Sequence, residues 1–307
     1  MTGINRRQAL GVLGAAAVGG LASPPLSAAT VTTQAALNWP PPPLDNPETI
    51  TLETSSEQPP RPLDVNRDYI IKLAPTIRTA GVIIEGGNNV VIIGGHIRLP
   101  VYAGPTGPSP RGIYVIGNQG VVHIEGVLID TASGDSLGDG IAIDADNAIV
   151  QVQKCRIMNI KGRQNSLHGD VMQPWGGVKE LRIDQLTASS TFQGLFCPVD
   201  RGPIGRVIVK RTNITALPEL EPGGGYMWWM GTQPIFIFSE FYVQPRSGRL
   251  LENSVWPDHN HATHPATVVN GVATWPTMSN VTGGIRGGQP AGGDFCPAGV
   301  PGIGYTP

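Results

Sequence analysis

Four polar residues occupy equivalent places in a series of short apolar segments, and they are the first candidates for chemistry. They are Arg111, Asp139, Asp170 and Gln193, at spacings of 28, 31 and 23 residues. If the segments are stacked strands, neighbours in this ladder lie about 4.8 Å apart at the backbone. Asp139 and Asp170 could then share one proton, one sugar or one ion, and we expect them to be candidate ligands of Ca²⁺.

Other polar residues near Asp170 have the types needed for β-elimination on an acidic sugar. In this reaction a base removes the proton next to the carboxylate while a cation stabilises the developing charge. His168 or Lys161 could be the base, and Arg163, Arg111 or Ca²⁺ could neutralise the acid group of the substrate. We therefore predict His168, Asp170, Lys161 and Arg163 as the catalytic group.

Two other interpretations of the acid pair remain open. A glycoside hydrolase would use both carboxylates directly, and a spacing of about 5 Å would favour the retaining geometry. The structural interpretation comes from strand parity, because Asp139 shares a face with Ile141 and Ile143, and Asp170 shares one with Met172. Without a bend both acids would point inward, where polar ladders satisfy buried backbone groups.

Aromatic and amide side chains are the candidates for binding a sugar. Trp228 and Trp229 are adjacent in a strand-like segment, so one of them must face out of a regular strand. An exposed indole is a natural platform for a sugar ring. The alternative to a lyase is thus a noncatalytic glycan-binding or surface-associated protein. The predicted substrate-binding residues are Arg111, Gln173, Trp175, Gln193, Trp228 and Trp229.

Histidines and cysteines give weaker indications of a metal site. Three histidines near the C-terminus could hold a metal or could belong to a solvated loop: His259, His261 and His264. The cysteines have no Cys-x-x-Cys spacing, which favours buried or incidental thiols: Cys155, Cys197 and Cys296.

A repeat along the chain predicts the elements that must position these residues. Short apolar runs recur at intervals of 31, 28, 31, 26 and 28 residues, centred on Ile93, Ile124, Val152, Ile183, Val209 and Ile237. A second strand-like series lies between them, and two strands per period are typical of a solenoid. Six rungs at about 4.8 Å each give a stack roughly 25 to 30 Å long, which suits an extended polymer.

The composition agrees with a turn-rich all-β protein. The 307 residues include 41 Gly and 29 Pro, and charged residues supply only 14% of the chain, so long helices are not expected. The formal net charge is −2 and no basic stripe is present, which argues against a nucleic-acid partner.

Two segments carry a family resemblance: Gly-Asp-Gly-Ile-Ala-Ile at 138–143, and His-Gly-Asp-Val-Met-Gln at 168–173 with Leu-Arg-Ile-Asp at 181–184. Over about residues 65–245 the chain resembles exported right-handed parallel β-helix proteins of the pectate-lyase-like superfamily. The resemblance implies a single-stranded right-handed parallel β-helix. Because such coils carry lyases, hydrolases, epimerases and binders, it leaves the activity open. The Asp-Asp and Gly-His-Gly motifs of polygalacturonase-like hydrolases are absent.

The ends of the chain differ from the repeat. Residues 1–29, with Arg6, Arg7 and a small-residue end, are typical of an export signal and resemble the twin-arginine type without its usual Phe and Lys. We predict a Pro-rich linker and N-terminal cap at 30–64, the β-helix at 65–247, and an irregular tail packed on the coil at 248–307.

Together these features predict an exported protein in the periplasm or outside the cell, not held in a membrane after signal removal. Its expected partner is an acidic polysaccharide or another glycan, and β-elimination at uronic-acid residues is the leading reaction. The sequence defines no oligomeric state.

Overall fold

Short runs of alternating aliphatic residues form strands here because one side of each run can be buried. The computed structural model describes residues 36–104, 109–197, 201–256 and 263–307, and these contain 21 strands and no α-helix. Their one helical turn is the 3-10 helix η1 (Leu251–Asn253). None of the helical structure in these ranges is long and apolar enough to cross a membrane. The predicted all-β class is confirmed, whereas the predicted export signal lies outside the described residues.

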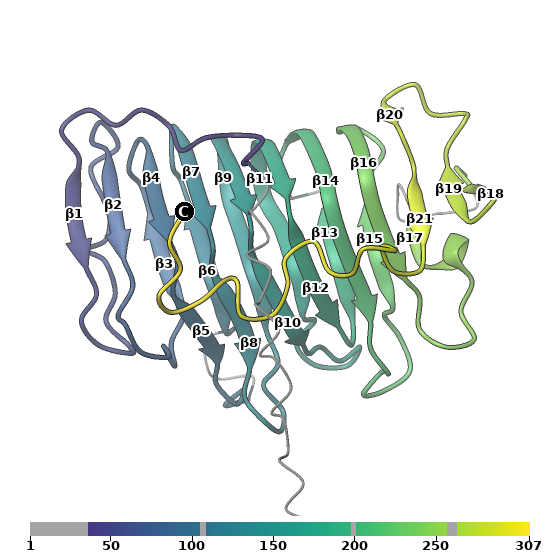
Figure 1. The fold of residues 1–307 in the computed structure, drawn as a ribbon, viewed down its shortest axis with the longest axis horizontal. Coiled ribbons are helices and arrows are strands. Elements are labelled where there is room, and N and C mark those ends of the chain that lie inside the picture. Colours follow the sequence, from purple (N-terminus) through teal and green to yellow (C-terminus); the bar gives the residue numbers. More distant parts are fainter. Residues whose placement is uncertain (1–35, 105–108, 198–200, 257–262) are drawn as a thin grey trace, which may run out of the picture. The chain divides into compact units, whose positions relative to one another are not determined.

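The strands stack in parallel into a β-solenoid of about 6 turns, with three sheets along its length (Figure 1). Sheet I contains β3 (Val82–Glu85), β6 (Arg111–Ile116), the first parts of β9 (Asp139–Gln153) and β11 (Asp170–Asp184), β13 (Gln193–Cys197), β15 (Tyr226–Met230) and β17 (Val255–Trp256). Sheet II contains β1 (Glu48–Thr51), β2 (Tyr69–Lys72), β4 (Val90–Ile93), β7 (Val121–Glu125), the second parts of β9 and β11, the first parts of β14 (Ile204–Ala216) and β16 (Ile235–Gln244), and β20 (Val281–Thr282). Sheet III contains β5 (His96–Leu99), β8 (Leu128–Thr131), β10 (Arg156–Ile160), β12 (Leu186–Ser190), the second parts of β14 and β16, and β21 (Ile285–Gly287).

The core is filled by rows of side chains in register from one turn to the next. One row of sheet II consists of Ile92, Ile124, Val152, Ile183, Val209 and Phe238, all of them buried. Four of the six residues predicted from the repeat lie in this row. Ile93 and Ile237 do not, because each is one residue out of register and a one-residue slip turns a side chain to the other face.

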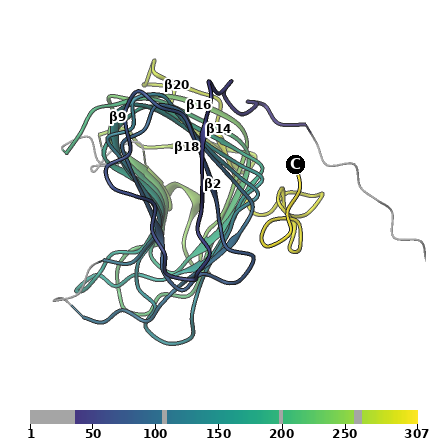
Figure 2. The same ribbon diagram turned by 90° about the vertical axis from the view of Figure 1, so that its left-hand side faces the viewer.

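The connections between the sheets differ greatly in length. Sheet II passes to sheet III through one or two residues, as at 126–127 and 185, or within a single strand. Sheet III returns to sheet I through two residues at 191–192 and through much longer segments at 132–138, 161–169, 217–225 and 245–254. Seen end-on, these segments project together from one corner of the coil (Figure 2). These connections therefore lie beside sheet I.

Strands of the three sheets extend beyond the predicted bounds of residues 65–247 at both ends of the solenoid. β1 precedes residue 65, and β17, β20 and β21 continue the three sheets beyond residue 247. The antiparallel hairpin of β18 (Thr267–Val269) and β19 (Val272–Thr274) pairs with β21 at that end.

The segment before β1 is a strap bound to the outer face of sheet II. The Trp39 N–H donates to Oε1 of the Gln153 side chain, and Gln153 Nε2 donates to the Trp39 carbonyl. Gln151 Nε2 donates to the Pro40 carbonyl over 3.2 Å. The guanidinium of Arg182 and the ammonium of Lys210 lie 5.8 and 5.2 Å from the centre of the Trp39 ring. The Pro-rich stretch predicted as a linker therefore covers part of the coil.

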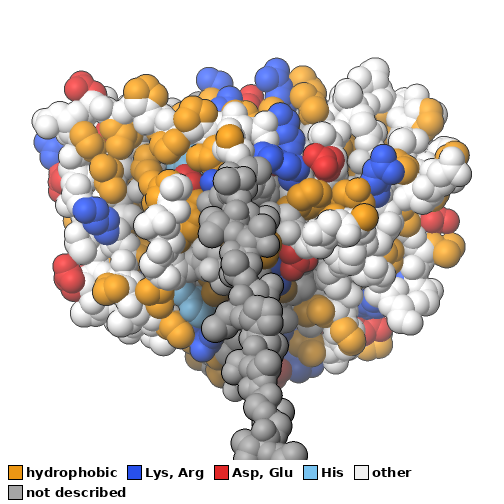
Figure 3. Space-filling model, in the orientation of Figure 1, with side chains coloured by type: hydrophobic (Ala, Val, Ile, Leu, Met, Phe, Trp, Pro, Cys, Tyr) orange, Lys and Arg blue, Asp and Glu red, His pale blue; other side chains and the backbone are white. Residues whose placement is uncertain are grey.

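The last residues of the chain run back along the coil, as the sequence predicted. Asn213 Nδ2 donates to Asp294 over 2.9 Å, the Cys296 amide donates to Thr187 Oγ1, and the Tyr305 hydroxyl donates to buried Glu125. This tail lies outside the coil in Figure 2 and crosses the face drawn in Figure 3, where acidic and basic side chains are interspersed.

Replacing Gly126 by alanine is expected to detach the end of this tail. Gly126 has φ +66°, and a Cβ there would lie 2.2 Å from Cδ1 of Tyr305. Hydrogen exchange of residues 300–307 should become faster, and stability should fall by about 1–2 kcal/mol from the left-handed backbone alone. The control is Gly304→Ala, with φ +80° and open space around its Cβ. Equal protection of the tail in both variants would contradict the docking role of this contact.

Candidate functional site

The polar ladder predicted from the sequence is present on sheet I. Arg111 pairs in register with Asp139, and the pairing of Met172 with Ile141 puts Asp170 beside Asp139. The Asp170 amide donates to Asp139 Oδ1 over 3.1 Å. Asp170 pairs with Gln193, and Gln193 pairs with Tyr226, so the row continues one turn further than predicted.

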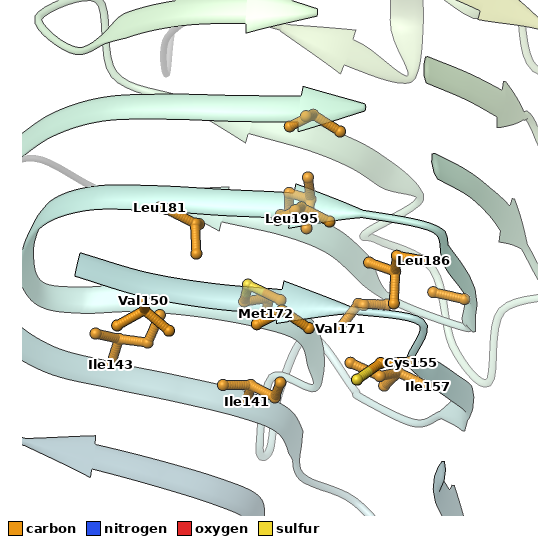
Figure 4. Packing of buried hydrophobic residues seen from close by; sticks show 14 of the residues in the cluster. Ile141, Ile143, Val150, Cys155, Ile157, Val171, Met172, Leu181, Leu186 and Leu195 are labelled. Carbon is orange, nitrogen blue, oxygen red and sulfur yellow. The ribbon is translucent and has the colours of Figure 1, made fainter. Parts of the chain in front are cut away.

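A bend at the start of each strand decides which way the ladder faces. Val171 and Met172 are adjacent, yet both belong to the buried core (Figure 4), and the same holds for Met227 and Trp228. Strict alternation therefore fails at this point, and the residue before the pair lies outside the core. The two ends of the ladder face outward as well, because Arg111 and Tyr226 contact rings on the outer face of sheet I. Strand alternation would turn both acids inward only if the strands had no bend, and these strands are bent.

The two acids of the ladder are nevertheless buried. Asp139 Oδ2 lies 3.5 Å from Arg111 Nε, and burial raises the pKa of Asp139 to about 6. Asp170 is 0% exposed, and neither of its carboxyl oxygens has a hydrogen-bond partner in the described structure. Burial and the nearby charge of Asp139 raise the pKa of Asp170 well above its ordinary range. The protonated form of Asp170 is thus favoured, while the Arg111 guanidinium lies beside the carboxylate of Asp139.

This arrangement does not fit the predicted Ca²⁺ site. Ca²⁺ takes about six to eight oxygen ligands, whereas the ladder offers two carboxyl groups beside the positive charge of Arg111. The described ranges contain no group of three or more His, Cys, Asp or Glu side chains placed to hold a metal. Of the three histidines in the C-terminal segment, His259 and His261 lie outside the described residues.

The four predicted catalytic residues do not converge. His168 is exposed, with Nε2 3.2 Å from the Gln164 carbonyl oxygen and its ring 4.7 Å from that of Phe192. Lys161 Nζ donates to two carbonyls of the 132–138 connection, over 3.1 and 2.8 Å. Arg163 forms an ion pair with Asp135 over 2.8 Å. Within the described structure, no hydrogen bond or ion pair joins these side chains to one another or to Asp170.

The adjacent tryptophans lie on opposite sides of β15, as the parity of the strand predicted. Trp228 is 0% exposed and packs in the core, with its ring centre 4.9 Å from Phe236, 4.6 Å from Phe238 and 4.9 Å from Trp275. Trp229 lies half-buried on the outer face. Trp228 was also predicted to bind substrate, and its complete burial excludes that contact.

Trp229 belongs to an aromatic cluster formed by Phe196, Tyr226, Trp229 and Trp256 on the outer face of sheet I. Ring centres are 5.1 Å apart for Phe196 and Trp229, 4.9 Å for Tyr226 and Trp229, and 4.1 Å for Tyr226 and Trp256. β13, β15 and β17 supply these rings from three successive turns. The cluster therefore extends along the solenoid axis.

A pocket of about 650 Å³ adjoins the cluster at Tyr226 and Trp256. Its other wall is the 245–254 connection, which carries Arg246 and Arg249. Arg246 forms an ion pair with Glu219, whereas Arg249 donates to the carbonyls of Asn253 and Gly224 over 2.8 and 2.7 Å. The Arg249 guanidinium lies 4.4 Å from the Tyr226 ring centre, and no carboxylate of the described residues pairs with it. The pocket thus presents an aromatic face and an uncompensated cation.

A second pocket, of about 390 Å³, lies at the other end of sheet I. It is lined by Arg111 and Tyr114 and by the connection before β6, with the Arg111 guanidinium 4.5 Å from the Tyr114 ring centre. Trp175 is half-buried with its ring centre 6.4 Å from that of Tyr114, and Gln173 is half-buried on the same face. Gln193 belongs to the buried ladder and is only 1% exposed.

Four residues around the pocket beside the aromatic cluster were not predicted from the sequence: Tyr226, Trp256, Arg246 and Arg249. The repeat contained a signal for Trp256, because Trp229 and Trp256 are 27 residues apart and are paired in register. The two arginines come from an irregular connection, where no period predicts which side chain reaches the sheet.

Comparison of the chain with protein-family models, curated proteins and solved structures gives no match.

Proposed function

We propose that the protein binds an acidic polysaccharide along the outer face of sheet I without cleaving it. The observation that carries this proposal is the aromatic cluster beside Arg249. Tyr and Trp rings stack on sugar faces through their apolar surface, and a guanidinium binds carboxylates in a bidentate manner. A solenoid places these groups in a row, which suits an extended polymer.

The same geometry gives less support to β-elimination. That reaction needs a base and a cation at the same sugar ring. Lys161 and Arg163 are each bound to the 132–138 connection, whereas His168 contacts the Gln164 carbonyl oxygen. Direct hydrolysis by the acid pair would require Asp170 to meet substrate, and Asp170 is fully buried. Binding is therefore the function that the described residues support best. Export to the periplasm or beyond remains a prediction from residues 1–29.

Replacing Trp229 by alanine is expected to weaken binding of an acidic polysaccharide about tenfold or more, as for aromatic hot spots in other interfaces. Affinity electrophoresis in gels containing polygalacturonate, alginate or hyaluronate measures this directly, and Tyr226→Ala should behave similarly. The control is Tyr242→Ala, which removes a half-buried ring that packs on Phe295, on sheet III.

Retention of the wild type but not of Trp229→Ala would support the proposal. Equal retention of the two proteins, or no retention of the wild type by any acidic polymer, would refute it. An increase in ultraviolet absorbance from unsaturated sugar ends would instead show cleavage by elimination.

A further inference from the structure

An arginine lies on the ring of a sheet I tyrosine at both ends of the outer face. The distances from guanidinium to ring centre are 4.5 Å for Arg111 and Tyr114, and 4.4 Å for Arg249 and Tyr226. Each pair borders one of the two pockets, and each pocket lies between sheet I and a connection from sheet III. The two ends therefore share one construction although they are distant in the sequence.

The two pairs are separated by a fixed number of turns. β6 and β15 are linked by the pairings β6–β9, β9–β11, β11–β13 and β13–β15. At about 4.8 Å for each step, Tyr114 and Tyr226 lie about 19 Å apart along the axis. The outer row that starts at Tyr114 continues through Ala142, Gln173 and Phe196 to Trp229, whose ring contacts that of Tyr226, and none of these residues is charged. A chain lying on this row meets no charged side chain within it.

The two pockets differ in charge. Arg111 is next to Asp139, which it neutralises, and the rest of its pocket is lined mainly by apolar side chains and backbone. Arg249 has no carboxylate partner among the described residues, so the pocket at Tyr226 retains a positive charge. An acidic group is therefore favoured at the Tyr226 end, and an apolar sugar face at the Tyr114 end.

We propose that the two pockets are subsites for a single polysaccharide chain, with an acidic sugar at Tyr226 and a stacked sugar ring at Tyr114. This inference rests on the proposed function. Once one subsite is filled, binding at the other is intramolecular, so a chain that spans the gap gains affinity from both. A chain shorter than the gap fills one subsite only. The proposal thus requires a threshold in ligand length.

The test is calorimetric titration with size-fractionated oligogalacturonates, or with oligomers of whichever acidic polymer the gels retain. For the wild type, affinity should increase about 100-fold once the oligomers span both subsites. In Tyr114→Ala the short oligomers should bind as they do to the wild type, while the increase for long ones should disappear. Ser109→Trp is a second variant, designed to fill the same pocket without removing a packed ring. Tyr242→Ala is the control, expected to behave as the wild type.

The outcomes separate this inference from the proposed function. If Tyr226→Ala binds every oligomer as the wild type does, the proposed function fails. If Tyr226→Ala loses binding but Tyr114→Ala and Ser109→Trp retain the full length dependence, the cluster binds glycan and the two-subsite inference is overturned. If Tyr226→Ala weakens binding of all oligomers, while Tyr114→Ala and Ser109→Trp lose only the increase for long oligomers, the inference is supported.

Discussion

Replacing Trp228 by alanine should lower the free energy of unfolding by about 3–5 kcal/mol, the range for removal of a large buried aromatic side chain. Trp228 is 0% exposed and packs between Phe236, Phe238 and Trp275. The cavity left behind would be bordered by three turns of the coil and by the C-terminal segment. Chemical denaturation monitored by far-ultraviolet circular dichroism measures the change.

The adjacent residue provides a matched control. Trp229→Ala removes the same side chain from the half-buried outer face, so its effect on stability should be much smaller. When both variants are compared in their folded states, Trp229→Ala should weaken glycan binding more than Trp228→Ala does. Equal destabilisation by the two changes would contradict the opposite orientations of these neighbours.

Replacing Asp170 by asparagine is expected to stabilise the protein above pH 6. Asp170 is fully buried, and neither of its carboxyl oxygens has a partner in the described structure, so its ionised form is disfavoured. Asparagine has nearly the same shape and no charge, and its amide could donate to Gln193 Oε1, which lacks a partner. Asp146→Asn, at an exposed acid, is the control and should change little.

The wild type should accordingly lose stability as the pH rises through the acid range. Asp139 has a pKa of about 6 in the folded protein against an ordinary value of 3.8, so the folded state holds this proton more tightly than the unfolded chain. The resulting stability is complete below pH 3.8 and is lost as the pH rises to about 6. At about 1.4 kcal/mol for each pKa unit, the loss is about 3 kcal/mol.

Urea denaturation at several pH values, with and without Ca²⁺, tests this explanation. Asp170→Asn should make the pH dependence shallower, since it removes the second buried carboxyl group whose pKa is raised in the folded protein. A destabilised Asp170→Asn protein, together with a wild type that Ca²⁺ stabilises, would show instead that the pair holds a cation.

The acid pair shows which features of a site can be predicted from the sequence. Spacing alone placed Arg111, Asp139, Asp170 and Gln193 in one row, and the strand pairings confirm that row. The chemistry assigned to it depended on exposure and on convergence with His168, Lys161 and Arg163. Exposure is set by packing of the long connections, and these side chains bind carbonyls and carboxylates within the connections.

The aromatic cluster shows the same division. Alternation along β15 predicted that one of Trp228 and Trp229 faces out. The contacts of Trp229 with Phe196 and Trp256, and of Tyr226 with Arg249, join residues from separate turns and from an irregular connection. No local pattern encodes such contacts.

The sequence by itself determined the all-β class, the period of the turns and the order of the residues in each row. These follow from alternation and spacing, which are properties of neighbouring residues and of the repeat length. The tertiary structure decided which side of sheet I the ladder occupies, because the paired core residues Val171 and Met172 interrupt the alternation. It also decided that the acids are buried and that arginines from distant connections lie on Tyr114 and Tyr226, since both depend on how remote segments pack together.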